Sequence, residues 1–463
     1  MSWNHLAAAL TALLTTLSLT PLAAAAPSDA FAPPAPAYEP GPAPAQLADA
    51  ARHSSSTPVD PFLFDPDDPF YLPPEHLPSD PGAVLRTQDA PHLLNVGGED
   101  LPGHASKILY ASTRADGAPT AVSGVVIEPA RAWPGDGPTP TIVFAPGTRG
   151  GGDACAPSRG PWLTGVVDPV ARSVGVNYEV MMSYAASLQG IRVIVTDYIG
   201  LGAPGPHTYV HHTEEAHAVL DAARAGLRAT GAPADSPIAF SGYSQGGGAA
   251  AAAAELAAEY APELNVKGTY SGAPPADLPV VMSAVDGSLI SGVLGYAMAG
   301  FSARDPEFAA ALNGILSDEG RAFVADNAAS CIGDSALNWG MRPTNSLTVS
   351  GTSLSEAAFA DPYLTEALSA QNLGQRGPAT PVMISGGDHD DVIPNGQVRQ
   401  LGRDYCAAGA PVFYLADATP SMTGGERFAV DHAVGMFTSQ PQALNYLIDR
   451  FNGLPAPDNC GAF

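Results

Sequence analysis

The sequence predicts an α/β fold with a mostly parallel central sheet, helices on both faces and a helical cap insertion. Three observations support this fold class: short apolar runs of strand length, helical segments that alternate with them, and one long stretch without strand patterns. Strands that alternate with helices are joined by crossovers, so they pair in parallel. The strand-like runs cover residues 107–112, 122–127, 141–145, 191–196, 238–240, 267–271, 381–385 and 411–415.

The first two of these runs differ from the others in their connection. Asp116-Gly117 lies between them, and this dipeptide is typical of a tight hairpin turn, so we expect an antiparallel pair there. Residues 141–145 and 191–196 are continuously apolar instead. Such runs are typical of strands that are buried on both faces of a parallel sheet.

Helices are predicted between and after the parallel strands. Residues 212–229 place acidic residues first, basic residues late and apolar residues at helical spacing. Residues 246–260 are rich in alanine, and a further helix should begin near Asn395. The stretch 277–377 shows no convincing strand, while Asp305-Pro306 and Ser355-Glu356 each open an amphipathic helix. We therefore expect 277–377 to be the helical insertion.

Composition and charge exclude several classes of partner. The chain has 463 residues, of which 45% are hydrophobic and 14% charged, and its formal net charge is −26. Such acidity argues against nucleic-acid binding and against electrostatic docking on an anionic membrane. The apolar content is sufficient for a sizeable core, and we expect a monomer.

The N-terminus is predicted to be a secretory signal peptide, residues 1–26. Residues 6–19 form an apolar run, followed by Pro21 and a small-residue stretch at 23–26. The run is too short to span a bilayer, so we expect a secreted protein with no integral membrane segment in the mature chain. Residues 27–66 are dense in proline and alanine and should form a linker, which leaves 67–463 as the globular domain.

The pentapeptide Gly242-Tyr243-Ser244-Gln245-Gly246 is the strongest chemical signal in the chain. It has the G-x-S-x-G pattern and lies between an apolar strand and an alanine-rich helix. A nucleophile elbow needs this context, because the serine occupies a strained turn and its neighbours must lack bulk. Ser244 is therefore predicted to be a nucleophile in an α/β-hydrolase fold.

An activated serine needs a base and an acid, which follow it along the chain in this fold. The segment after 381–385 offers Asp388, Asp390 and Asp391, and we predict Asp390 because a turn there leaves the next residues free to pack. Asp388 and Asp391 remain alternatives. His432 is the only histidine C-terminal to Asp390, so it is the predicted base.

An oxyanion hole requires two backbone N–H donors. One should be the amide of Gln245, directly after the nucleophile. The other should come from the loop after 141–145, with Thr148 as first choice and Gly147 as second.

No metal or organic cofactor is predicted. The histidines at 207, 211, 212 and 217 match no zinc motif, and we interpret them as satisfied or solvated side chains. The four cysteines, Cys155, Cys331, Cys406 and Cys460, predict two disulfides in an exported chain, and spacing alone permits three pairings.

Several motifs resemble the secretory lipase family of the yeast lipase A type over most of residues 67–463. They are DPFYLPP at 68–74, YASTRADGAPTAVSGVVIEP at 110–129, PGTRGGGDACAPS at 146–158, GYSQGGGAA at 242–250 and DDVIP at 390–394. The resemblance implies hydrolysis of triacylglycerols or other carboxylic esters, a cap over the active site, and the disulfides Cys155–Cys331 and Cys406–Cys460. The yeast type has an acidic residue in the oxyanion loop, so the second donor carries over only as the region 146–153.

These observations predict a secreted, serine-dependent carboxylic ester hydrolase whose substrate is an ester or lipid. The apolar segment 280–301 should line an acyl pocket, form part of a lid, or serve as a core helix. Two alternatives stay open: another triad hydrolase, such as an exported peptidase or an acyltransferase, and a non-catalytic lipid-binding protein.

Overall fold

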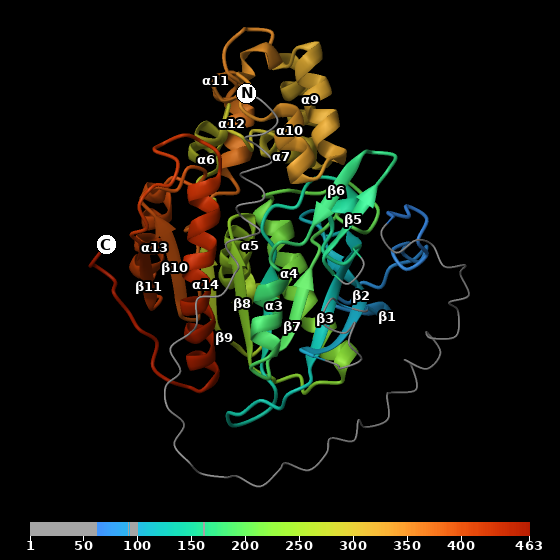
Figure 1. Cartoon of the computed structure of the whole chain (residues 1–463), viewed down its shortest axis with the longest axis vertical. Coiled ribbons are helices and arrows are strands. Elements are labelled where there is room, and N and C mark those ends of the chain that lie inside the picture. The colour runs from blue at the N-terminus through green and yellow to red at the C-terminus, as the bar shows by residue number, and fades with distance from the viewer. Residues whose placement is uncertain (1–62, 91, 93–100, 161–162) are drawn as a thin grey trace. The chain divides into compact units, whose positions relative to one another are not determined.

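A nine-stranded sheet is the centre of the computed structural model, which describes residues 63–90, 92, 101–160 and 163–463 (Figure 1). Chain contacts separate residues 1–43 from residues 44–463, and all described residues belong to the second unit. The strand order is β1-β2-β3-β7-β4-β8-β9-β10-β11. The strands are β1 Val84–Asp89, β2 Gly103–Thr113, β3 Pro119–Pro129, β4 Thr141–Ala145, β7 Arg192–Thr196, β8 Ile238–Tyr243, β9 Val266–Gly272, β10 Val382–Gly387 and β11 Val412–Asp417.

The type of strand pairing changes once across this sheet, at β7. Neighbouring strands pair antiparallel from β1 through β2 and β3 to β7. From β7 onward the neighbours pair in parallel, in the order β7, β4, β8, β9, β10 and β11. The predicted α/β-hydrolase fold with a mostly parallel sheet is confirmed. Because parallel strands share one carboxyl edge, the loops after β4, β8 and β10 come together there.

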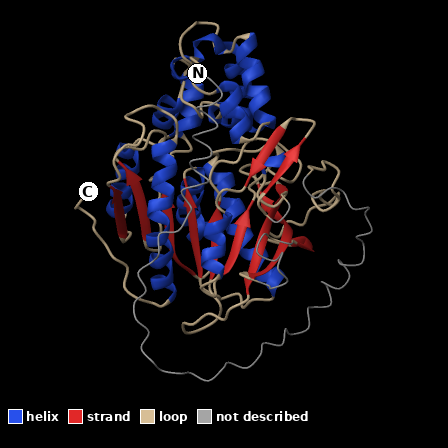
Figure 2. Cartoon of the chain, viewed as in Figure 1, coloured by secondary structure: helices blue, strands red, loops and turns tan. Residues whose placement is uncertain are grey.

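Helices cover both faces of the sheet (Figure 2). The face against α3 (Val180–Ser187) and α14 (Val430–Phe451) has its own apolar cluster, which includes Tyr184, Tyr270 and Leu447. The opposite cluster contains residues of α4 (His212–Thr230), α5 (Gln245–Tyr260) and α13 (Asn395–Ala407). Strand residues contribute alternately: Phe240 belongs to the second cluster and Ala239 to the first. This alternation follows from the two-residue repeat of a strand.

Seven α-helices between β9 and β10 form the helical cap (Figure 1). They are α6 Leu278–Val285, α7 Val293–Arg304, α8 Pro306–Ile315, α9 Asp318–Ala329, α10 Ile332–Trp339, α11 Leu354–Phe359 and α12 Pro362–Ser369, with the 3₁₀ turn η4 Thr344–Leu347 among them. The predicted start of α8 is correct, since Asp305 caps it and Pro306 is its first residue. The helix expected at Ser355-Glu356 begins earlier, at Leu354, because Ser353 and Glu356 form a capping box.

Several elements had no sequence-based prediction. They are β1, helices α3 and α14, the 3₁₀ turn η3 (Asp153–Cys155), and a separate antiparallel hairpin of β5 (Gly165–Asp168) and β6 (Ser173–Val176). The predicted signal peptide, residues 1–26, lies outside the described residues, as does the predicted linker up to residue 62. Within the last residues of that linker, Leu63 forms a parallel bridge with Val167 of β5.

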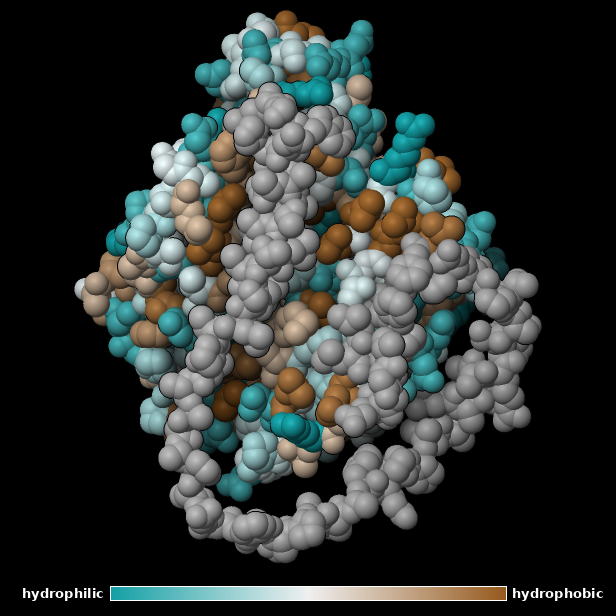
Figure 3. Space-filling model, in the orientation of Figure 1, coloured by the Kyte–Doolittle hydropathy of each residue, from teal (hydrophilic) through white to brown (hydrophobic). Residues whose placement is uncertain are grey.

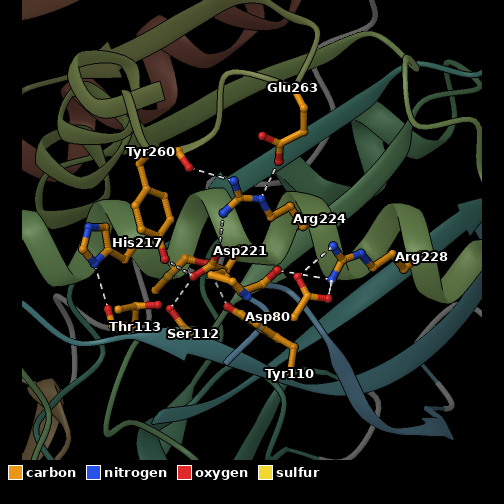
Figure 4. A network of polar contacts seen from close by, with 12 residues as sticks. Asp80, Tyr110, Ser112, Thr113, His217, Asp221, Arg224, Arg228, Tyr260 and Glu263 are labelled. Carbon is orange, nitrogen blue, oxygen red and sulfur yellow. Dashed lines mark hydrogen bonds and ion pairs between the residues drawn. The ribbon is translucent and has the colours of Figure 1, made fainter. Parts of the chain in front are cut away.

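A buried polar network holds α4 against β2 (Figure 4). The Asp221 carboxylate accepts hydrogen bonds from Ser112 Oγ at 2.7 Å, Tyr260 Oη at 2.8 Å and Arg224 Nη1 at 2.8 Å. Its side chain is fully buried, so these three donors replace the water that a carboxylate needs. At the exposed end of the same helix, Arg228 pairs with Asp80 at 2.9 Å.

Candidate active site

Ser244 lies in a sharp turn between β8 and α5. Its φ of 59° and ψ of −126° belong to a region that non-glycine residues seldom occupy. The flanking glycines are required by space, since a Cβ on Gly242 would lie 2.1 Å from the Gly246 carbonyl oxygen. A Cβ on Gly246 would lie 2.0 Å from the carbonyl oxygen of Ala145 in β4. The turn therefore has the geometry of a nucleophile elbow at the carboxyl edge of the sheet.

His432 lies in the first turn of α14 and is paired with an aspartate from the loop after β10. Its Nδ1 is 2.8 Å from Asp390 Oδ2, and both side chains are largely buried, with exposed fractions of 11% and 3%. Asp390 Oδ1 accepts the backbone amides of Val392 and Ile393 at 2.9 and 2.8 Å. Because a carboxylate can only accept hydrogen bonds, the imidazole Nδ1 is the donor in this pair and Nε2 is left as an acceptor.

The other two aspartates of that loop make different contacts. Asp391 Oδ1 accepts the backbone amide of His432 at 3.0 Å, and burial raises the pKa of Asp391. Asp388 pairs with Arg399 at 2.9 Å on the exposed side of the loop. Of the three candidates, Asp390 alone contacts the imidazole.

Tyr243 connects His432 to the elbow. Its hydroxyl donates to the His432 carbonyl oxygen at 2.9 Å, and the two rings have centroids 5.0 Å apart. Tyr243 directly precedes Ser244, so the residue before the predicted nucleophile contacts His432. Among the described residues, no hydrogen bond joins Ser244 Oγ to His432, and contacts of this kind in enzymes often shorten only when substrate binds.

The loop after β4 is held by residues that had no sequence signal. The Gly147 amide donates to Glu179 Oε2 at 2.8 Å, and Arg149 Nη2 donates to the same oxygen at 2.7 Å. Tyr178 Oη donates to the Thr148 carbonyl oxygen at 2.9 Å and lies under the Arg149 guanidinium, 3.8 Å from ring centre to carbon. Burial raises the pKa of Glu179, and Arg149 opposes this effect. Tyr178 and Glu179 lie about thirty residues after the loop, so only tertiary structure reveals their role.

Gln245 is anchored from α4 and from the loop before it. Its Nε2 donates to Glu215 Oε1 at 2.8 Å and lies 3.3 Å from His207 Nε2. Burial raises the pKa of Glu215 to about 8 and lowers the pKa of His207 to about 4. Tyr209 Oη lies 2.7 Å from Thr148 Oγ1, so one stretch of chain contacts both predicted oxyanion segments.

A largely apolar cavity with about 600 Å³ of empty space opens beside Ser244. Ser244, Gln245 and Thr148 form its polar end. The cap provides most of its apolar wall, through Leu278, Val281, Met282, Val285, Ile290, Val293, Leu294, Ala297, Met298 and Leu368. Residues of the segment 280–301, for which an acyl pocket, a lid or a core helix was expected, form part of this wall.

The predicted disulfide pairing is confirmed. Cys155 bonds to Cys331 and Cys406 to Cys460. The first bond ties the segment that follows the predicted oxyanion loop to the residue before α10, so the cap is linked covalently to this edge of the sheet.

Each of the four histidines at 207, 211, 212 and 217 makes a hydrogen bond through its imidazole ring. His207, His212 and His217 each bond a backbone carbonyl through Nδ1, and His211 accepts the Glu214 amide. Within the described ranges, no group of three or more acidic, histidine or cysteine side chains is arranged to hold a metal ion.

A serine at the elbow of a central parallel strand, with a histidine–aspartate pair at the same edge, is the arrangement of α/β-hydrolases. The sequence profile of the family described as secretory lipase matches residues 168–459. The chain belongs to the secretory lipase family, as its motifs indicated.

Proteins with similar sequences along most of their length carry lipase names. The chain is 29% identical over 402 residues to a protein of Mycobacterium tuberculosis named a probable inactive lipase, covering 86% of this chain and 84% of that protein. It is 25% identical to lipase A of Arthroderma benhamiae, with coverage of 85% and 81%. A secreted triacylglycerol lipase of Malassezia globosa is also 25% identical, with coverage of 85% and 83%.

Solved structures support the fold. Lipase A of Candida antarctica in its closed state has a TM-score of 0.70 at 19% identity, covering 88% of this chain and 92% of that one. The cell wall degrading esterase LipA of Xanthomonas oryzae has a TM-score of 0.64 at 19% identity, with coverage of 80% and 99%. Across the described part of the chain, every helix is too short or too polar to cross a bilayer.

Proposed function

We propose that this protein is a secreted carboxylic ester hydrolase that acts on triacylglycerols or related esters through an acyl-enzyme on Ser244. The observation that carries the proposal is the position of Ser244: it occupies a strained elbow and opens directly onto an apolar cavity. Such a cavity suits the acyl chain of an ester, while Ser244 meets its carbonyl carbon. Secretion is supported by the N-terminal sequence and by relatives named secreted lipases.

The first half of the reaction forms the acyl-enzyme. Ser244 Oγ attacks the ester carbonyl carbon while His432 Nε2 takes the hydroxyl proton. Asp390 holds the tautomer in which Nδ1 bears the hydrogen and stabilises the imidazolium that forms. His432 then passes the proton to the leaving alkoxide, and the alcohol departs.

The second half releases the acid. His432 takes a proton from water, the resulting hydroxide attacks the acyl carbon, and Ser244 recovers its proton from the imidazolium. In both halves the negative oxygen is held by backbone amides. We assign these to Gln245 and Thr148, because the Gly147 amide already donates to Glu179.

The direct test measures turnover of p-nitrophenyl esters of increasing acyl length by the mature, disulfide-bonded protein. We expect hydrolysis that Ser244→Ala reduces by at least about 10³-fold. Hydrolysis that persists in this variant would refute the role of Ser244. Peptide turnover, or transfer to an added alcohol in preference to water, would favour a peptidase or an acyltransferase.

A non-catalytic lipid-binding role is the second candidate, because the relative from Mycobacterium tuberculosis is named inactive. A fluorophosphonate probe separates the two, since it reacts covalently only with an activated serine. Labelling that is lost in Ser244→Ala supports the enzyme, whereas absence of labelling in the folded protein supports the binding role.

A further inference from the structure

The hairpin β5–β6 exposes an apolar surface at the carboxyl edge of the sheet. Val167 and Val174 face each other across its two strands and are 40% and 49% exposed. Val176 on the same strand face is 57% exposed, and Val170 in the turn is 91% exposed. Figure 3 shows hydrophobic side chains gathered in the region where Figure 1 labels β5 and β6. We call Val167, Val170, Val174 and Val176 the hairpin patch.

The turn of this hairpin is built to present its apolar side chain outward. Hairpin turns are ordinarily polar, yet this turn, Pro169-Val170-Ala171-Arg172, has three apolar residues and one exposed arginine. The buried Asp168 carboxylate accepts the amides of Val170 and Ala171 at 2.8 and 3.0 Å. The Asp168 carboxylate therefore points inward and shapes the backbone of the turn, while Val170 is exposed at the tip beside Arg172.

Hydrogen bonds attach the patch to the candidate active site. Arg149 Nη1 donates to the Val176 carbonyl oxygen at 3.0 Å, directly beside the oxyanion loop. The chain then continues into Tyr178 and Glu179, which hold Thr148 and Gly147. On the other side, Asp334 of the cap helix α10 accepts the Val174 amide at 3.1 Å. The patch is therefore fixed in position next to the cavity that contains Ser244.

Charge indicates which kind of surface the patch can meet. Between residues 165 and 178, Asp168 and Arg172 are the only charged residues, and Asp168 is buried. The whole chain carries a net charge of −26, which an anionic surface would repel. An uncharged or zwitterionic lipid surface accepts exposed valines without this penalty.

We propose that the hairpin patch docks the protein on an uncharged lipid–water interface and thereby brings that interface to the cavity beside Ser244. This proposal rests on the proposed function for its purpose, but the binding event can be measured without catalysis. The valines of the hairpin patch insert among the lipid molecules. Because the oxyanion loop is hydrogen-bonded to the segment that continues from the hairpin, this insertion places the loop close to the lipid surface.

The test uses the mature chain with Ser244→Ala, so that lipid is bound but not consumed, and phosphatidylcholine vesicles in a sedimentation assay. Val170→Asp should lower the vesicle partition coefficient on the order of tenfold, because a valine is withdrawn from lipid and replaced by a charge. Val349→Asp is the matched control, since Val349 is 69% exposed and lies in the cap between η4 and α11. That variant should bind as the parent does.

Further measurements separate loss of lipid binding from loss of catalysis and from dissociation of a dimer. In the chain that retains Ser244, Val170→Asp should leave turnover of a soluble short-chain ester unchanged but lower turnover of emulsified triacylglycerol. Added phosphatidylserine should weaken vesicle binding. Equal binding by the parent, Val170→Asp and Val349→Asp would overturn the proposal, and so would a Val170→Asp variant that only dissociates a dimer. Failure of soluble-ester turnover in the parent would refute the proposed function instead.

Discussion

The Glu179 carboxylate lies 2.8 Å from the Gly147 amide nitrogen and 2.7 Å from Arg149 Nη2, so one buried oxygen holds both sides of Thr148. Arg149 and Glu179 have side chains that are 2% and 12% exposed. A buried pair of this kind costs desolvation to form, but removing one partner leaves the other charge uncompensated.

Glu179→Ala should therefore lower the free energy of unfolding by about 3–5 kcal/mol, measured by urea denaturation. Glu179→Gln should cost less, because its amide oxygen can still accept the Gly147 hydrogen. The control is Asp318→Asn, which breaks the surface pair between the fully exposed Asp318 and Arg321 and should change the urea midpoint little. Equal midpoints for Glu179→Ala and the control would contradict this assignment.

The two adjacent aspartates of the β10 loop should differ in their effect on catalysis. Asp390→Asn removes the charged acceptor from His432 Nδ1, and comparable changes in a serine triad lower kcat by about 10⁴. Asp391→Asn keeps an oxygen for the His432 backbone amide and should lower kcat by less than about tenfold. Steady-state kinetics of ester hydrolysis measure kcat for both variants. A larger loss of kcat in Asp391→Asn than in Asp390→Asn would mean that Asp391, and not Asp390, orients His432.

Glu215 should make the stability of the protein depend on pH. Burial raises its pKa from 4.5 to about 8 in the folded state, so the folded protein binds a proton that the unfolded chain releases near pH 4.5. The stabilisation by the neutral carboxyl is complete below pH 4.5 and is lost as pH rises towards 8. Since each pKa unit of difference is worth about 1.4 kcal/mol, this decline is on the order of a few kcal/mol.

Glu215→Gln supplies the matched variant for that effect. The amide cannot ionise, yet its oxygen can still accept from Gln245 and from the Val210 amide. Urea unfolding at several pH values between 5 and 9 should show a smaller decline for the variant than for the parent. Parallel curves would mean that another group causes the pH dependence.

The network of Figure 4 makes a prediction about stability alone. Asp221→Ala leaves Arg224 and the hydroxyls of Ser112 and Tyr260 without their buried acceptor, and should cost about 3–5 kcal/mol. Asp80→Ala breaks only the exposed pair with Arg228 and should change the unfolding midpoint little. Thermal unfolding of both variants tests the contrast, and equal shifts would refute it.

Sequence patterns were sufficient wherever neighbouring residues set the structure. The parallel strands, helices α4 and α5 and the turn at Ser244 were all predicted, because apolar periodicity and glycine spacing act within a few residues. The edge strand β1 and the hairpin β5–β6 were missed, because short, partly exposed strands have no strong apolar pattern. Helix α14 was missed too. Pro441 lies inside it, and an internal proline ordinarily argues against a helix.

Local patterns and motifs predicted the secretory lipase family, the α/β-hydrolase fold and the residues that we propose for ester hydrolysis. Three features were visible only once the chain is folded: the aspartate that contacts the His432 imidazole, the amide that donates to Glu179, and the cap residues that line the cavity. The Gly147–Glu179 and Asp390–His432 hydrogen bonds join residues 32 and 42 positions apart. Their geometry depends on how whole elements pack against one another, which no pattern of neighbouring residues records.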